Sequence, residues 1–385
     1  MGDALFLVIG FLIGMASGIL PGLHPNTLIS ILASLGLDDR SMALLIISLY
    51  PASLISSFIP AIFFGIPEAG TVLATLPGHR MVLKGEGMAA LKTVLLSSLL
   101  AALLAAALFE LSLDFFQLAY GMMKSNMGWL LLGLSLVLLT RAKKPHLSAG
   151  IFVISGLLGH YSLNSGMRDP FLPLFCGMFA LAAMATYGKN EIPEQKDGKI
   201  GLGFVRFAVV GVVLGMLADL IPGIGSPSQV ATFATMMMPV DTLGYLAAIS
   251  AISVSQSIFS LSTSIAIDKS RVGATAWLSG FMDIGENAAL LLPLFIISMA
   301  LAVLVVYMLR KRIAGIASMD FSRMNIVLAL YLGAVTFVLD GFTGLVVLVV
   351  AAALGWLTIR LGVERTALMG SIIVPTLLLL FRIFF

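Results

Sequence analysis

The stretch GILPGLHPN, residues 18–26, places two prolines and two glycines deep in an apolar run that begins at Ala4. A proline inside a helix removes a backbone hydrogen bond and clashes with the preceding turn, at a cost of about 3 kcal/mol or more. The stretch DLIPGIGSPS, residues 219–228, repeats the pattern in the second half of the chain. The sequence therefore predicts two helices that break within a membrane.

The composition decides the class of protein. Of 385 residues, 59% are hydrophobic and 11% are charged, whereas soluble domains carry about 25% charged residues. The chain is predicted to be an all-α polytopic membrane protein with about 10 to 14 transmembrane segments, including broken or re-entrant helices. Its longest polar stretch, residues 189–199, is too short for a soluble domain. ATP-driven transport by this polypeptide alone is therefore not expected.

Apolar runs bounded by charges or turn residues define the predicted helices. They cover residues 4–20, 27–35, 42–58, 59–76 with interruptions, 89–111, 127–140, 147–162, 170–186, 202–221, 229–238, 243–259, 274–282, 288–309, 326–339, 341–359 and 367–384.

The two breaks belong to a longer internal repeat. GMASGILPGLHPNT at residues 14–27 aligns with GMLADLIPGIGSPS at residues 215–228 without a gap. An apolar helix, a Ser-rich or Pro-Gly-interrupted stretch and a long helix follow each copy. Such repeats are typical of secondary transporters. The predicted divisions are a first inverted repeat at 1–141, a connecting hairpin and cytoplasmic loop at 142–201, a second inverted repeat at 202–312, and C-terminal transmembrane helices at 313–385.

Basic clusters indicate that the repeat is inverted. RAKKPH at residues 141–146 and RKR at residues 310–312 are expected on the cytoplasmic side. The run 89–111 follows basic residues and ends in acidic ones, so it is predicted to run outward. Its partner 288–309 ends in RKR and is predicted to run inward. We therefore expect a multi-pass protein of the cell membrane with an external N-terminus.

The breaks are the predicted substrate site. Irregular backbone in a membrane must be covered by protein or line a water-filled space, and a half-helix that begins there presents a positive dipole end suited to an anion. The alternative is a pair of kinks with glycine for close packing. No Lys or Arg lies within either break, so neutral amide and hydroxyl donors are expected to hold the anion. The candidate residues are Pro21, Gly22, His24, Asn26, Thr27, Pro222, Gly223, Gly225, Ser226, Ser228 and Gln229.

A second constellation is IPAIFFGIPEAG, residues 59–70, which adds Gly65 and Pro67 to the substrate site. The corresponding region of the second half, residues 253–270, adds Ser260 and Thr263, although Ser and Thr also serve as small packing residues. Acids within a membrane are functional by default, so Glu68 and Asp219 are the candidate ion-coupling residues for Na⁺ or H⁺. For Glu68 there is an alternative interpretation, in which it lies in a loop at the membrane surface and does not bind the coupling ion.

These segments resemble the TctA-type permease family, the large membrane subunit of the tripartite tricarboxylate transporters. The resemblance is carried by the two Pro-Gly breaks and by FFGIPEAGTVLATLPGHRMVLKGEG at residues 63–87. It implies uptake of citrate-like or other carboxylates with an ion gradient, and it implies partners, a small membrane subunit and a binding protein. The chain is a shortened variant in which His24 and Asn26 stand where small residues are frequent, and Glu68 stands where a glycine usually follows Pro67.

The preferred function is a secondary active transporter of small organic anions, di- or tricarboxylate-like, working by alternating access. The alternative is a translocase for an anionic lipid carrier such as polyprenyl phosphate, which would need a site open sideways to lipid. A channel or structural subunit is disfavoured by the inverted repeat. No enzymatic pattern, metal spacing, cofactor motif or nucleic-acid signal is found in the sequence. The expected partners are the substrate, the lipid bilayer, the two subunits named above and a second copy in a homodimer.

Overall fold

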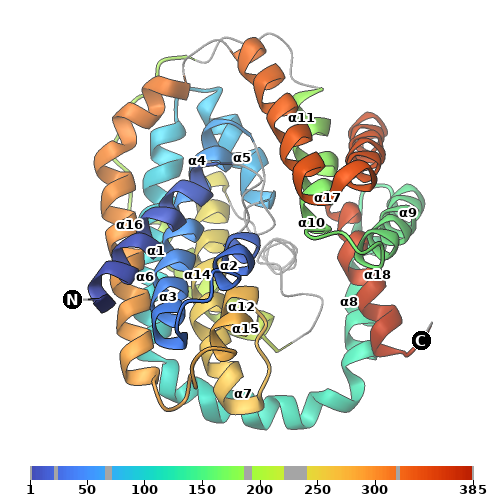
Figure 1. Ribbon diagram of the computed structural model, residues 1–385. Coiled ribbons are helices and arrows are strands. Elements are labelled where there is room, and N and C mark those ends of the chain that lie inside the picture. Colours follow the sequence, from blue (N-terminus) through green and yellow to red (C-terminus); the bar gives the residue numbers. More distant parts are fainter. Residues whose placement is uncertain are drawn as a thin grey trace.

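The computed structural model describes residues 2–20, 25–65, 72–185, 193–220, 241–317 and 321–383. All regular structure in these ranges is helical (Figure 1). The helices are α1 (Gly2–Ile19), α2 (Pro25–Ala33), α3 (Asp39–Ser56), α4 (Phe58–Phe63), α5 (Val72–Val82), α6 (Gly87–Ala107), α7 (Phe109–Met123), α8 (Met127–Arg141), α9 (Pro145–Leu163), α10 (Phe171–Phe175), α11 (Ala182–Met184), α12 (Phe204–Ala218), α14 (Thr242–Ile267), α15 (Gly273–Ser279), α16 (Ala288–Ala317), α17 (Phe321–Arg360) and α18 (Gly370–Leu380).

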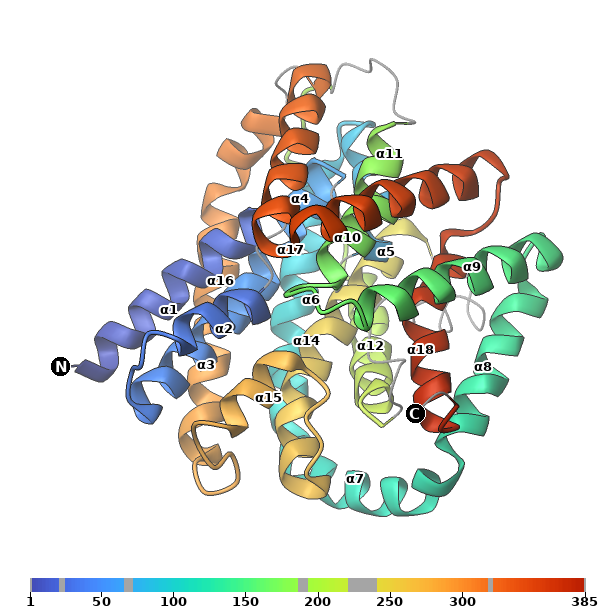
Figure 2. The ribbon, with the colours of Figure 1, turned by 45° about the vertical axis from the view of Figure 1, so that its right-hand side comes forward.

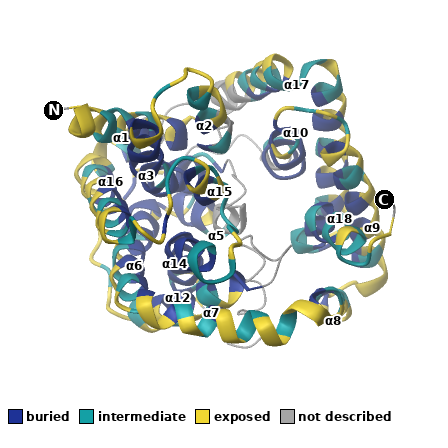
Figure 3. Cartoon of the chain, turned by 60° about the horizontal axis from the view of Figure 1, so that its bottom comes forward, coloured by how far each residue is buried: buried dark blue, intermediate teal, exposed yellow. Residues whose placement is uncertain are grey.

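Long apolar helices confirm the membrane class. Within the described ranges, eight helical segments are long and apolar enough to cross a bilayer, and three shorter apolar helices accompany them. Large apolar side chains such as Leu5, Leu12, Trp129 and Val338 are exposed. Figure 3 shows exposed stretches along the outer helices and buried stretches inside the bundle. Such surfaces suit contact with lipid tails rather than with water.

The helices form two bundles, which Figures 1 and 2 show from two sides. In the central bundle, α1 packs on α3, α12 packs on α14, and α6 and α16 complete the wall. In the lateral bundle, α9 packs on α18, and α17 packs on the π-helical segment Cys176–Leu181 that joins α10 to α11. Helix α7 runs along the bottom of Figure 1 from one bundle to the other.

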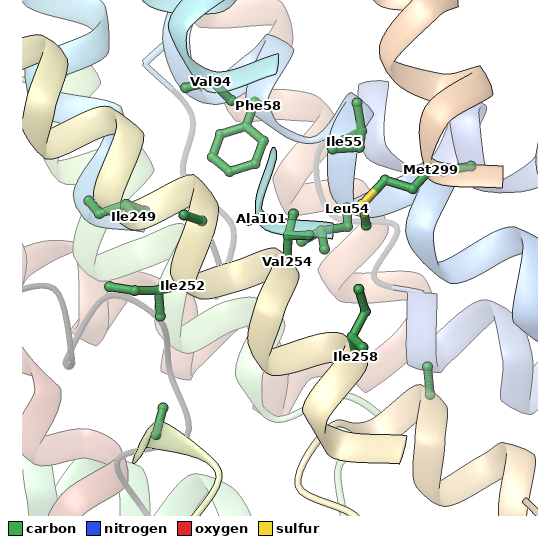
Figure 4. Close-up of a cluster of buried hydrophobic side chains, with 14 of the residues drawn as sticks. Leu54, Ile55, Phe58, Val94, Ala101, Ile249, Ile252, Val254, Ile258 and Met299 are labelled. Atoms are coloured by element: carbon green, nitrogen blue, oxygen red, sulfur yellow. The ribbon is translucent and has the colours of Figure 1, made fainter. Parts of the chain in front are cut away.

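The core of the central bundle lies where helices from both halves of the sequence meet. Figure 4 shows Ile55 of α3, Phe58 of α4, Val94 of α6, Ile258 of α14 and Met299 of α16 pointing toward one another. All five side chains are fully buried or nearly so. Because segments far apart in the sequence share this core, the two halves fold as one unit rather than as separate domains.

Glycines set the closest helix contacts in the central bundle. Gly10, Gly14 and Gly18 recur every fourth residue on α1, and a Cβ at each would meet a backbone carbonyl oxygen of α3. Gly211 and Gly215 of α12 face α14 in the same manner. Membrane helices approach this closely where small residues remove the side chain from the interface. The predicted repeat therefore has two helix pairs that pack alike.

Helix α14 is longer than the sequence predicted. The expected end was Phe259, before a stretch thought to be interrupted, but the helix continues to Ile267. Hydroxyl groups of Ser250, Ser253 and Ser257 donate to carbonyls three or four residues earlier in the same helix. Each hydroxyl is therefore satisfied without leaving the helix, and the polar stretch stays helical and buried.

Helix α7 differs from the sequence prediction, whereas the division of α17 agrees with it. Residues 112–126 lie between two predicted helices, yet Phe109–Met123 is helical, with Phe109 and Phe116 buried and its acidic residues exposed. The predicted division between helices 326–339 and 341–359 is confirmed, because the backbone at Gly341 is not helical and divides α17 into two helical parts at a kink, with φ at 63°. Glycine tolerates this positive φ, which other residues rarely adopt.

A polar latch holds the segment between the two halves, residues 193–198, against the central bundle. Gln195 accepts a hydrogen bond from the backbone nitrogen of Gly87 at 2.9 Å. Asp197 binds Lys92 of α6 at 2.8 Å and Arg310 of α16 at 3.0 Å. Hydrogen bonds from Lys92 and then Arg310 lower the pKa of Asp197 below its ordinary value. The latch therefore ties one helix from each half to the same carboxylate.

Candidate functional site

Asp219 lies where α12 ends, directly before residues 221–240, which are outside the described ranges. Its side chain is 0% exposed. Thr263 of α14 donates a hydrogen bond to Oδ2 at 3.2 Å, and Gln256 also lies near the carboxylate. Oδ1 has no hydrogen-bond partner among the described residues. A buried carboxylate with one oxygen unpaired is costly unless a further group completes its surroundings.

The chain turns sharply back after α14 and brings a loop onto this carboxylate. Asp268 adopts left-handed backbone angles, with φ at 52°, and closes the helix by donating its backbone N–H to the carbonyl of Thr263. The hydroxyl of Ser260 then accepts hydrogen bonds from the backbone nitrogens of Arg271 at 3.2 Å and Val272 at 3.0 Å. The loop is therefore fixed on the same face of α14 that carries Thr263.

Arg271, held by this loop, brings a positive charge to the site. Its Nε donates to the backbone oxygen of Asp219 at 3.1 Å, and its side chain is partly buried. The guanidinium interacts electrostatically with the Asp219 carboxylate and with Tyr120 of α7. No described ion pair within 4 Å joins the two charges. The site thus holds one carboxylate and one guanidinium, which are close but do not form a direct ion pair.

Asn26 connects the first break to the same region. It lies in the first turn of α2, and its side chain packs directly against Gly273 at the start of α15, where a Cβ would collide with it. Gly273 is two residues beyond Arg271. Residues from both halves of the repeat therefore converge on one loop. The backbone of Thr27 lies in α2, but its side chain is outside the description.

Gly65 lies just after α4. Its φ is +65°, and the ring of His79 lies against it, 3.3 Å from the position of a Cβ. Nδ1 of His79 lies 3.2 Å from the carbonyl oxygen of Ile62. The left-handed angle favours glycine at this turn.

The remaining predicted site residues lie outside the described residues. They are Pro21, Gly22, His24, Pro67, Glu68, Pro222, Gly223, Gly225, Ser226, Ser228 and Gln229. Within the described ranges, no group of three or more His, Cys, Asp and Glu side chains could hold a metal ion.

Of the predicted residues, the structure brings together Asp219, Thr263 and Ser260, with Asn26 beside the same loop. Sequence reasoning missed Arg271 because it looked for cations only within the breaks. The sequence carried little signal for it, because Arg271 follows Asp268 and Lys269 in a polar run, and basic residues are common at the ends of membrane segments. A site with both charges can accept a cation beside Asp219 and an anion beside Arg271.

Comparisons with known proteins extend over nearly the whole chain. The model of the tripartite tricarboxylate transporter TctA family matches residues 4–370. An uncharacterized protein of Methanocaldococcus jannaschii is 24% identical over 99% of this chain and 100% of its own length. No solved structure matches the chain.

Proposed function

Because the chain belongs to the tripartite tricarboxylate transporter TctA family, and so is a membrane transporter, we propose that it carries small organic anions of the di- or tricarboxylate type. Transport is driven by an ion gradient. The substrate is bound where the two broken helices approach each other, and alternating access exposes that place to one side of the membrane at a time.

One observation carries this proposal: a buried acid and a partly buried guanidinium lie at the end of α12. Charged groups are expensive in a membrane interior and persist where they serve transport. Asp219 suits a coupling cation, since its Oδ1 lacks a partner among the described residues. Arg271 and the amide of Asn26 suit a carboxylate. Glu68, outside the described residues, stays a second proposed coupling group.

The packing of the two halves supports alternating access. Helix α3 packs against α1 and α16, and α14 packs against α12 and α6. If α1, α3 and α6 correspond to α12, α14 and α16, each of these contacts in one half has a counterpart in the other. An inverted repeat requires such a correspondence. With Cys176, the single cysteine, replaced by serine, new cysteines at Lys84 and Glu286 are expected to react from opposite sides of the membrane. Reaction from the same side would contradict the inversion.

The family description names a tripartite system, so we include a small membrane subunit and a substrate-binding protein among the proposed partners. The binding protein would deliver the anion to the external side, and the described chain would carry it across.

The test is uptake by the purified chain in proteoliposomes. Radiolabelled citrate and succinate are supplied outside, with an inward Na⁺ gradient, an inward H⁺ gradient or no gradient. We expect accumulation against a concentration gradient under one of the two ion gradients, with unlabelled carboxylates competing and cationic amines having no effect. Adding candidate partner subunits separates a chain that works alone from one that needs them. If no carboxylate is taken up or bound under any of these conditions, the proposed function is wrong.

A further inference from the structure

The guanidinium of Arg271 uses only part of its hydrogen-bonding capacity within the described residues. Nε donates to the backbone oxygen of Asp219, and no other hydrogen bond of the side chain is found there. An arginine held through Nε still presents its two Nη groups as a planar fork, which matches the two oxygens of a carboxylate. Among the described residues, no group accepts a hydrogen bond from the carboxylate-binding edge of Arg271.

The position of this edge is fixed rather than left to a long flexible side chain. Ser260 holds the backbone nitrogens of Arg271 and Val272, and Nε is anchored on the end of α12. A charged group fixed in advance binds an anion without a further ordering cost. The next residue, Gly273, carries the Asn26 amide against its backbone. The charge of Arg271 and the amide of Asn26, which comes from α2, thus meet at residues 271–273.

The nearby Asp219 carboxylate opposes the binding of an anion. It attracts the guanidinium of Arg271 electrostatically and would repel a second carboxylate brought to the same place. Thr263 stabilises only one of its oxygens among the described residues. A cation or proton at Asp219 removes the repulsion and leaves the charge of Arg271 unshared.

We propose that Arg271 is the residue that binds the substrate carboxylate, and that Asp219 controls its availability. Binding of a cation at Asp219 frees Arg271, so the cation binds first and the organic anion second. This inference rests on the proposed function and adds to it the anion-binding group and the order of binding. It replaces the expectation that neutral donors alone hold the anion.

The experiment measures citrate affinity of the purified full chain in detergent by isothermal titration, at one pH and one Na⁺ concentration. Arg271→Gln should weaken binding about tenfold or more, because charge and fork are both lost. Arg271→Lys keeps the charge but loses the fork, so binding should weaken several-fold. Asp219→Asn should strengthen binding several-fold. Arg40→Gln, which removes an arginine from the exposed ion pair with Asp3, is the matched control and should bind as the wild type does.

The opposite effects of Arg271 and Asp219 separate binding from structure. If Arg271 only tethered α12, Arg271→Gln and Asp219→Asn would both be less stable than the wild type. Asp219→Asn would then not bind citrate more strongly. Unchanged citrate affinity in Arg271→Gln overturns the inference, and if that variant does not fold, unchanged affinity in Arg271→Lys overturns it. Weakened citrate binding in Asp219→Asn also overturns it. Absence of carboxylate binding in the wild type overturns the proposed function itself, so the two failures are distinguishable.

Discussion

The helix pairs α1–α3 and α12–α14 pack alike and end differently. Gly14 and Gly215 sit at corresponding places, each against a backbone carbonyl of the neighbouring helix. One turn later the first pair has Gly18, whose missing side chain lets Ser53 and Ser56 of α3 approach the backbone. The second pair has Asp219 at that place, fully buried.

The difference is one of chemistry on a shared framework. In the first pair, the hydroxyl of Ser17 lies within hydrogen-bond distance of the Gly14 carbonyl and of the Ser53 hydroxyl, each at 2.9 Å, so the end of the pair is polar but uncharged. In the second pair, Asp219 and Arg271 bring opposite charges. Close packing and charge therefore lie on different turns of the same helix, so the two pairs keep the same helix contact while only the second pair ends in charged groups.

The largest effect should come from the shared glycines. Gly14→Leu and Gly215→Leu each place a side chain against the backbone of the neighbouring helix, so the pair must separate, at a cost of about 3 kcal/mol or more. Gly133→Leu in α8 is the control, because its added Cβ meets nothing within 4 Å. Thermal unfolding of the purified variants is the measurement. If Gly14→Leu lowers the unfolding temperature strongly and Gly215→Leu leaves it unchanged, the two pairs do not pack alike.

A smaller effect should separate the charged end from the neutral end. Thr263→Val removes the hydroxyl that donates to the buried Asp219 carboxylate, which should cost about 1.5–3 kcal/mol. Ser53→Ala removes a neutral bond from Ser17 and should cost about 0.5–1.5 kcal/mol. Chemical unfolding of both variants measures these costs. In an Asp219→Asn background the cost of Thr263→Val should fall; equal costs in both backgrounds would mean that the carboxylate is not the partner that matters.

The smallest effect concerns the latch, which joins α6 of the first half to α16 of the second. Asp197→Asn should destabilise the protein by about 1 kcal/mol or less, because the ion pairs are partly exposed. The folded protein holds the pKa of Asp197 below its ordinary 3.8, so this stabilisation is present above that value and is lost as the pH falls through the lowered pKa. The stability difference between wild type and Asp197→Asn should therefore shrink below about pH 4. A difference that persists at lower pH would mean that the charge of Asp197 is not what stabilises the latch.

The sequence by itself determined the class and the helical content. Composition and the length of apolar runs are enough for a membrane protein, since lipid leaves the backbone no partner outside the helix. The spacing of Gly10, Gly14 and Gly18, and of Gly211 and Gly215, is local information that survives in the structure as helix contacts. The acid at Asp219 was identified because a carboxylate within an apolar run is rare.

Only the tertiary structure decided which groups meet. Arg271 lies far from Asp219 in the sequence and reaches it because the left-handed turn at Asp268 and the hydroxyl of Ser260 fold the loop back along α14. Asn26 meets this loop across the two halves through contact with Gly273. Hydrophobic periodicity and helix propensity depend on residues within a few helical turns of one another. The contacts of this site join segments that are far apart in the sequence, and they form only when the whole bundle packs.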